Sequence, residues 1–217
     1  MRAGKVRPFC KAAAQTVRPE TPSHTDRMRT ERFAFPFAAA FLAGYLPGIL
    51  LGRSGALSIG AQVAAWYMDK QSFAVFGKTF SAFASGTILQ LTFVLLCGLN
   101  VAGTPFLALH FLLCGGALGF CAASVMAYAG TKALVIYWLL TLLPDLASLF
   151  LSLWLSGHSA ILAEGLFRDV FGGGAARGAL CAAARRLLIR YGVAALFGAA
   201  ASAAGAGLAC LLGGVLL

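Results

Sequence analysis

Charged side chains are scarce in this sequence of 217 residues, of which only 11% are Asp, Glu, Lys or Arg and 60% are hydrophobic. Soluble globular domains carry about 25% charged residues. The chain therefore has too little polar side chain to cover a surface that faces water on all sides. Its mean hydropathy of +0.84 agrees with this. The composition excludes an ordinary soluble domain and indicates a protein that crosses a membrane several times.

Among the charged residues, acidic ones are scarcer than basic ones: the chain has 7 Asp and Glu and 17 Lys and Arg. The cations are not interleaved with aromatic residues as on a nucleic-acid-binding face, so no nucleic-acid partner is predicted. Most of them lie in residues 1–32 and 168–190, beside apolar runs. Polytopic membrane proteins keep such segments in the cytoplasm, where they attract anionic lipid headgroups. The predicted cation anchors at the inner membrane face are Arg177, Arg185, Arg186 and Arg190.

Motifs for catalysis and for metal binding are also absent. The six cysteines show no CxxC pair and no metal-ligand spacing, and no HExxH, GxSxG or Walker A pattern occurs. An intramembrane enzyme would have to use Asp145, His110 or His158 in its catalytic pair. We predict no catalytic residue, no metal, no cofactor and no small-molecule substrate.

Apolar runs near the 20 or so residues that a bilayer requires dominate the rest of the chain. They predict an all-α polytopic transmembrane bundle of about five spans, with a cytoplasmic N-terminus and an extracytoplasmic C-terminus. A sixth span stays open, because the apolar stretch that begins at Ala133 could extend past Gly157. Five spans keep the arginines of 168–190 in the cytoplasm. The predicted spans are 33–52, about 83–101, about 105–128, 133–156 and about 191–216.

The segments outside these spans complete the predicted organisation. Residues 1–32 are expected to form a disordered basic tail, and 33–217 the transmembrane domain. Residues 53–82 form an outer loop, and 157–190 a cytoplasmic loop with a short basic helix at 179–190. In the outer loop, Phe73, Phe76, Phe80 and Phe83 recur at helical spacing. That face either rests on the lipid interface or docks an extracytoplasmic partner.

Asp145 is the only acid well inside a predicted span, and it follows Pro144, which is expected to break the helix. An ionised carboxylate at that depth costs several kcal/mol unless it has a partner. Under a structural interpretation it is protonated or hydrogen-bonded to a neighbouring span. Under a functional one, a carboxylate at a helix break is an ion or proton site of a transporter. The expected hydrogen-bond partners are Gln90, His110 and Ser124.

Small residues at four-residue spacing predict close helix packing in two spans. Gly115 and Gly119 form such a step in the third span, and Gly198 and Ser202 in the fifth. Whether their neighbours belong to this chain or to another protein stays open at this point.

A set of motifs occurs in a fixed order along the chain: Gly103 and Pro105, Gly115 to Phe120, Gly130, Pro144 with Asp145, and Arg190 with Tyr191. In this order they resemble the stage II sporulation protein M family of bacterial integral membrane proteins. The resemblance covers about residues 33–217 and is densest over 103–153. Two positions depart from the family pattern: Cys114, where members often have Lys, and Asp145, where they tend to have Gln or Asn.

The resemblance implies a scaffold rather than an enzyme. It implies recruitment of peptidoglycan-degrading partners, resembling stage II sporulation proteins D and P, to the septal membrane of the mother cell during engulfment. The partners would dock on the glycine steps or on the outer loop. The alternative is a membrane component of an export or transport system, in which Asp145 would be functional.

Overall fold

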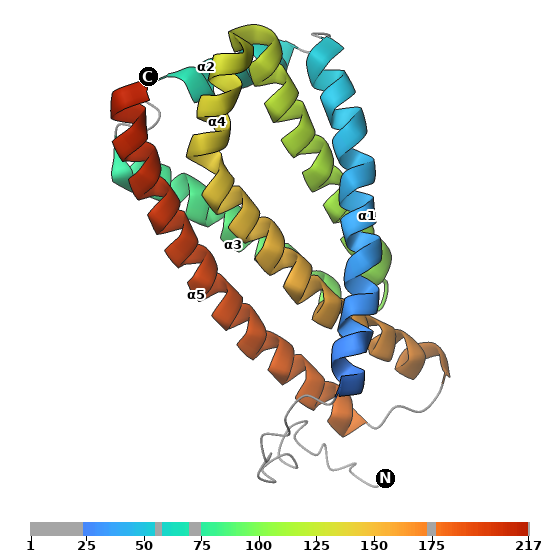
Figure 1. The fold of residues 1–217 in the computed structure, drawn as a ribbon. Coiled ribbons are helices and arrows are strands. Elements are labelled where there is room, and N and C mark those ends of the chain that lie inside the picture. Colours follow the sequence, from blue (N-terminus) through green and yellow to red (C-terminus); the bar gives the residue numbers. More distant parts are fainter. Residues whose placement is uncertain (1–23, 55–57, 70–74, 173–176, 217) are drawn as a thin grey trace, which may run out of the picture.

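The structure is a computed structural model that describes residues 24–54, 58–69, 75–172 and 177–216. The described residues form helices joined by short connections, with no strand among them. The helices are α1 (His24–Ser54), α2 (Ser58–Met68), α3 (Phe76–Gly98), α4 (Gly103–Gly172) and α5 (Arg177–Leu216), as Figure 1 shows. The all-α prediction is confirmed.

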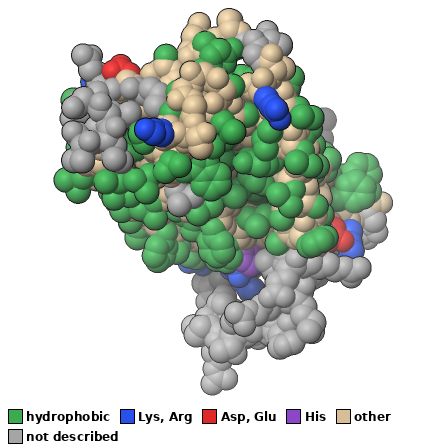
Figure 2. Space-filling view, turned by 45° about the horizontal axis from the view of Figure 1, so that its top comes forward, with side chains coloured by type: hydrophobic (Ala, Val, Ile, Leu, Met, Phe, Trp, Pro, Cys, Tyr) green, Lys and Arg blue, Asp and Glu red, His purple; other side chains and the backbone are tan. Residues whose placement is uncertain are grey.

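Five helical stretches are long and apolar enough to cross a membrane. Their sides expose many large hydrophobic residues, and Figure 2 shows a face on which hydrophobic side chains predominate and charged ones are few. A polytopic, multi-pass membrane architecture is therefore confirmed at the level of helix length and composition. The five stretches are Ala34–Ser54, Phe76–Gly98, Gly103–Thr141, Leu143–Phe171 and Leu180–Leu212.

The long helix α4 doubles back at Gly130, its one residue with non-helical dihedral angles (φ 84°, ψ −178°). Side chains disfavour this region of backbone conformation, whereas glycine enters it at little cost. The turn divides α4 into a first arm, 103–129, and a second arm, 131–172, which run in opposite directions in Figure 1.

This reversal gives the bundle two distinct ends. We call the end where α1 begins, α4 finishes and α5 begins the basic end, and the opposite one the Gly130 end (Figure 1). The described parts of the first and last helices thus begin and finish at opposite ends, as an odd number of spans requires. Arg168, Arg185, Arg186 and Arg190 belong to helix segments at the basic end, and Arg53, Lys78 and Lys132 to segments at the Gly130 end.

Two boundaries in the N-terminal half differ from the prediction. α1 begins at His24, so the part of the predicted disordered tail from 24 to 32 is helical, and residues 1–23 lie outside the described part. The predicted outer loop 53–82 holds all of α2 and the first two turns of α3. One face of each helix packs on the bundle, since Ala64 of α2 and Thr79 of α3 are buried.

The predicted cytoplasmic loop 157–190 is helical over most of its length. α4 continues to Gly172, and α5 begins at Arg177, so the expected short basic helix is the first part of a long one. Residues 155–157, 159, 160, 162 and 163 are buried. Small side chains lower the hydropathy of this stretch but permit close packing: a Cβ on Gly98 would lie only 2.8 Å from Cβ of Ser159.

The second arm of α4 is the centre of the bundle. Among the five apolar stretches, Leu143–Phe171 has the largest buried share, at 44%. Gln90 of α3 donates a hydrogen bond to Ser152 of this arm at 3.1 Å, and the hydroxyls of Thr92 and Tyr191 are 2.9 Å apart between α3 and α5. Polar contacts between helices are among the forces that hold bundles together in lipid.

Candidate functional site

The predicted glycine step of the third span packs against the first helix of the same chain. A Cβ on Gly115 would lie 2.0 Å from the carbonyl oxygen of Phe41, and one on Gly119 would lie 2.4 Å from that of Tyr45. No side chain fits at such distances, so the backbones of α1 and α4 are in direct contact. The step is thus occupied within the chain and is not a free docking surface.

The partner stripe on α1 consists of Gly44, Gly48 and Gly52. Cβ atoms at these positions would lie 1.9, 2.2 and 2.6 Å from carbonyl oxygens of Leu112, Gly116 and Phe120, respectively. Sequence reasoning missed this stripe, although its four-residue spacing was visible in the printed chain. Two complementary glycine stripes therefore join α1 to the first arm of α4.

The predicted packing residues of the fifth span also lie at helix contacts. A Cβ on Gly198 would lie 2.7 Å from Cγ2 of Thr87 in α3, and Ser202 is buried. One turn further, Gly205 receives Pro144 of α4, since a Cβ there would lie 2.8 Å from the proline Cδ.

Pro144 does not break α4, contrary to the prediction. The helix continues through it with helical dihedral angles, and the reversal of the chain occurs at Gly130 instead. The proline ring fits the notch that Gly205 leaves in α5. The expectation of a discontinuous helix with a carboxylate at its break, typical of transporters, is therefore wrong in its geometry.

Asp145 belongs to a polar cluster that we define by five side chains from three helical segments. Thr141 lies one turn earlier on the same arm and acts on this carboxyl group, while its hydroxyl donates a hydrogen bond to the backbone oxygen of Tyr137 at 3.1 Å. Tyr137 and Tyr67 meet edge to face with ring centroids 4.7 Å apart, and Tyr137 interacts electrostatically with both Asp145 and Cys121. The cluster thus connects α2, the first arm of α4 and its second arm.

The predicted partners of Asp145 lie elsewhere. Gln90 bonds to Ser152, and His110 stacks on Phe93 at 4.7 Å. The hydroxyl of Ser124 is buried without a hydrogen-bond partner among the described residues. The true neighbour Thr141 lay four residues away on the same helix, a spacing that brings side chains together.

The unexpected element of the cluster is Tyr67, which α2 inserts between the arms of α4. It touches two buried groups of side chains, one around Val125 and Tyr137 and the other around Leu140 and Ala209. Burial raises the pKa of the Tyr67 phenol well above its usual range, with smaller contributions from Cys121 and Asp145. The group is therefore an uncharged hydrogen-bonding group at physiological pH.

The aromatic face expected in the outer loop is divided by the structure. Phe76 and Phe80 stack on each other with centroids 6.1 Å apart, and Phe76 is half exposed. Phe83 instead packs on the group around Leu140 and Ala209. Phe73 lies outside the described residues.

The predicted cation anchors lie at the start of α5, at the basic end. Arg185 and Arg186 are exposed, Arg190 is half-buried, and Arg177 is the first residue of the helix. Nearby, Arg168 forms an ion pair with Glu164 at the end of α4. Their position agrees with contact to lipid headgroups at one membrane face.

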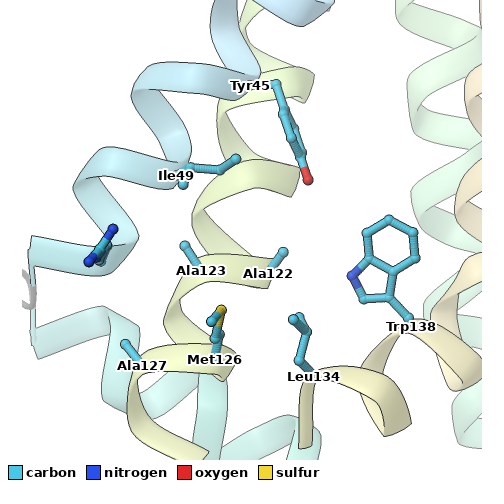
Figure 3. Close-up of a pocket in the computed structure, with 9 residues that line it drawn as sticks. Tyr45, Ile49, Ala122, Ala123, Met126, Ala127, Leu134 and Trp138 are labelled. Atoms are coloured by element: carbon cyan, nitrogen blue, oxygen red, sulfur yellow. The ribbon is translucent and has the colours of Figure 1, made fainter. Parts of the chain in front are cut away.

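A groove opens on the side of the bundle between α1 and the two arms of α4. Its larger part has a volume of about 460 Å³, and its smaller part, about 250 Å³. Both parts share Tyr45 and Trp138, so they adjoin. Figure 3 shows the larger part, which is lined by Tyr45, Ile49, Arg53, Ala122, Ala123, Met126, Ala127, Leu134 and Trp138.

Among the described residues, no group of three or more His, Cys, Asp or Glu side chains could hold a metal ion. The described side chains offer hydrogen bonding, burial of apolar groups and charge attraction.

Comparison of the chain with protein-family models, with curated proteins and with solved structures finds no match. The resemblance to the stage II sporulation protein M family thus stays a prediction that depends on the motifs quoted above.

Proposed function

We propose that this protein is a non-catalytic membrane scaffold that holds extracytoplasmic, peptidoglycan-degrading partners at the membrane. In a spore-forming cell this place would be the septal membrane during engulfment. The identity of the partners comes from the family resemblance. The proposal that the protein holds a partner is supported by the stacked pair Phe76 and Phe80 at the Gly130 end.

The pair is suited to docking because the other predicted docking elements are occupied. Both glycine steps pack inside the chain, so a partner needs another surface. Phe76 and Phe80 stand on the first turns of α3, and Gly77 and Lys78 beside them are exposed. Aromatic residues are enriched at the energetic centres of protein interfaces. The concentration of positive charge at the opposite end supports an extracytoplasmic position for this one.

A pull-down of the tagged full-length chain from its native cells, sampled into stationary phase, tests the scaffold. We expect mild detergent to co-purify peptidoglycan hydrolases with the wild type and to lose them with a double Phe76→Asp, Phe80→Asp variant. The control is Ser81→Asp, which adds a carboxylate to an exposed position on the same helix. Equal recovery from all three proteins, or recovery of no wall enzyme at any stage, would contradict the proposal.

A second candidate function is favoured by the polar cluster around Asp145. A carboxyl group inside an apolar span, one turn from Thr141 and next to two tyrosines, has the composition of an ion or proton site. The chain would then be the membrane component of an export or transport system.

Replacement of Asp145 by Asn separates the two functions. The amide keeps the size and hydrogen-bonding capacity of the carboxyl group but cannot carry charge. A scaffold should retain partner recovery in the Asp145→Asn variant at wild-type protein level. A transport component should lose activity at unchanged protein level, and its pull-down should contain a nucleotide-hydrolysing subunit instead of wall enzymes.

A further inference from the structure

The groove between α1 and the arms of α4 is elongated along the bundle axis. From the larger to the smaller part, its lining moves along α1 from Arg53 through Tyr45 to Phe41. Along the second arm of α4 it moves from Leu134 to Leu149. Each helix thus contributes residues at successive turns. The shape is that of a channel for a chain rather than of a pocket for a compact molecule.

The walls are apolar over most of this length, but polar groups line both parts: Asp145 and Thr141 belong to the wall of the smaller part, and Tyr45, Trp138 and Arg53 to that of the larger one. Figure 3 shows the Tyr45 hydroxyl and the Trp138 indole ring directed into the space between the helices. In the part of the chain that the structure describes, neither group has a hydrogen-bond partner within the protein. Both groups can donate a hydrogen bond to a bound molecule.

Arg53 lines the same part, at the Gly130 end, where α1 finishes. It is exposed, and no carboxylate among the described residues pairs with it. The larger part therefore has one permanent positive charge, two ring donors and no negative charge in its lining. Its electrostatic complement is an anion with several acceptor oxygens, for which a guanidinium group is well suited.

We propose that this groove is a binding site for one anionic phospholipid of the extracytoplasmic leaflet. Its phosphate group lies at Arg53, in the part of the groove that Tyr45 and Trp138 also line. One acyl chain follows the groove past these rings toward Leu146 and Leu149 in the smaller part, whose wall also includes Asp145 and Thr141. A single cationic mouth and walls that are mostly apolar match the two halves of such a molecule, and the groove opens between α1 and the arms of α4.

The proposal does not depend on the scaffold function. It implies that the lipid bridges α1 to the second arm of α4, whereas the glycine stripes join α1 only to the first arm. A bound lipid would thus fill the space between these two helices along the groove.

Native mass spectrometry of the purified full-length chain tests the site. The probes are phosphatidylglycerol and phosphatidylcholine with the same acyl chains, added to the detergent micelles. We expect the wild type to retain one phosphatidylglycerol in preference to phosphatidylcholine. The Arg53→Gln variant should lose this preference by about tenfold or more, as expected for one charge-assisted hydrogen bond.

The matched control is Lys132→Gln, which removes one exposed charge from the same end but does not line the groove. It should keep the preference. If both variants lose the preference for phosphatidylglycerol equally, Arg53 contacts only headgroups of the surrounding bulk lipid and not a lipid bound in the groove. The proposal then fails. Circular dichroism and gel filtration of each variant show whether the chain remains folded.

A second variant tests occupancy of the larger part of the groove with the charge intact. Ala127 lines this part from an exposed position, so Ala127→Phe fills space there. We expect loss of the retained phospholipid. Retention by this variant would contradict a phospholipid in the larger part. Recovery from native membranes of a single-chain isoprenoid phosphate in place of a phospholipid would overturn the assignment of the occupant.

Discussion

At the scale of single residues, Gly130 has the largest effect on the path of the chain, because it separates the two arms of α4. Its φ of 84° with ψ of −178° lies in a region that is almost restricted to glycine. A Cβ there would meet nothing within 4 Å. Any cost of a side chain at this position is therefore a cost of backbone conformation rather than of collision with a neighbour.

We predict that Gly130→Ala lowers the free energy of unfolding by about 1–3 kcal/mol. Gly86→Ala is the matched control, because its Cβ also meets nothing within 4 Å but its backbone is helical. That change should be neutral or stabilising by up to about 1 kcal/mol, since alanine is the better helix former. Thermal unfolding of both variants in one mild detergent measures the difference. Equal stabilities of the Gly130→Ala and Gly86→Ala variants would show that the backbone conformation at residue 130 does not require glycine.

Asp145 shows what a single polar residue can and cannot indicate before the fold is known. Its position inside a long apolar run was correctly identified as unusual. Its polar neighbour was not, since Thr141 lies on the same helix whereas partners on other spans were expected. The tyrosines that complete the cluster were not foreseen, because α2 brings Tyr67 to Tyr137 across 70 positions of sequence.

At the scale of helices, adjacent glycines in α4 have opposite roles. A Cβ on Gly115 would lie 2.0 Å from a backbone oxygen of α1, while one on Gly116 would have its nearest neighbour at 3.6 Å. Gly115→Ala must therefore separate two helices, whereas Gly116→Ala fits into the available space.

We predict that Gly115→Ala destabilises the bundle by at least about 1–3 kcal/mol, as overpacking of a close contact does. Gly116→Ala should be neutral or slightly stabilising. Unfolding in detergent, followed by circular dichroism, compares the two variants at the same temperature and protein concentration. A similar loss of stability in both variants would contradict this prediction. It would mean that α4 needs glycine at these positions for its own backbone conformation and not for close approach to α1.

The helices themselves were the most predictable part of the molecule, because their apolar length is a requirement of the bilayer. Their ends were less predictable. The second arm of α4 extends beyond Gly157 as a buried helix of small residues, which hydropathy ranks below the leucine-rich part before it. The glycine stripe of α1 was overlooked, and with it the identity of the helix that packs against Gly115 and Gly119.

The groove could not have been predicted at all. Its walls come from three helical segments whose relative rotation depends on the packing of glycine backbones and on the reversal at Gly130. In the sequence, Arg53 marks only the end of a predicted span, and Trp138 is one of many apolar residues. That both line one groove depends on how the helices of the bundle pack.

At the scale of the whole molecule, charge is distributed unequally between the two ends. The described cations of the basic end include Arg168 and the arginines at the start of α5, whereas the Gly130 end has Arg53, Lys78 and Lys132. Segments rich in Lys and Arg resist translocation. The basic end should therefore face the cytoplasm, and the Gly130 turn should face outward.

Single cysteines at the two ends of α4's second arm test this orientation in one helix. In a chain whose six native cysteines are replaced by alanine, a membrane-impermeant maleimide should label a Lys132→Cys variant in intact spheroplasts. An Arg168→Cys variant should react only after permeabilisation, because the arm crosses the bilayer between the two exposed positions. The cysteine-free chain should stay unlabelled. The reverse labelling pattern would mean that the protein has the opposite orientation in the membrane. Phe76, Phe80 and Arg53 would then not lie on the extracytoplasmic side, which would contradict both the proposed docking pair and the proposed lipid leaflet. Labelling of both variants from outside would mean that the second arm does not span the membrane.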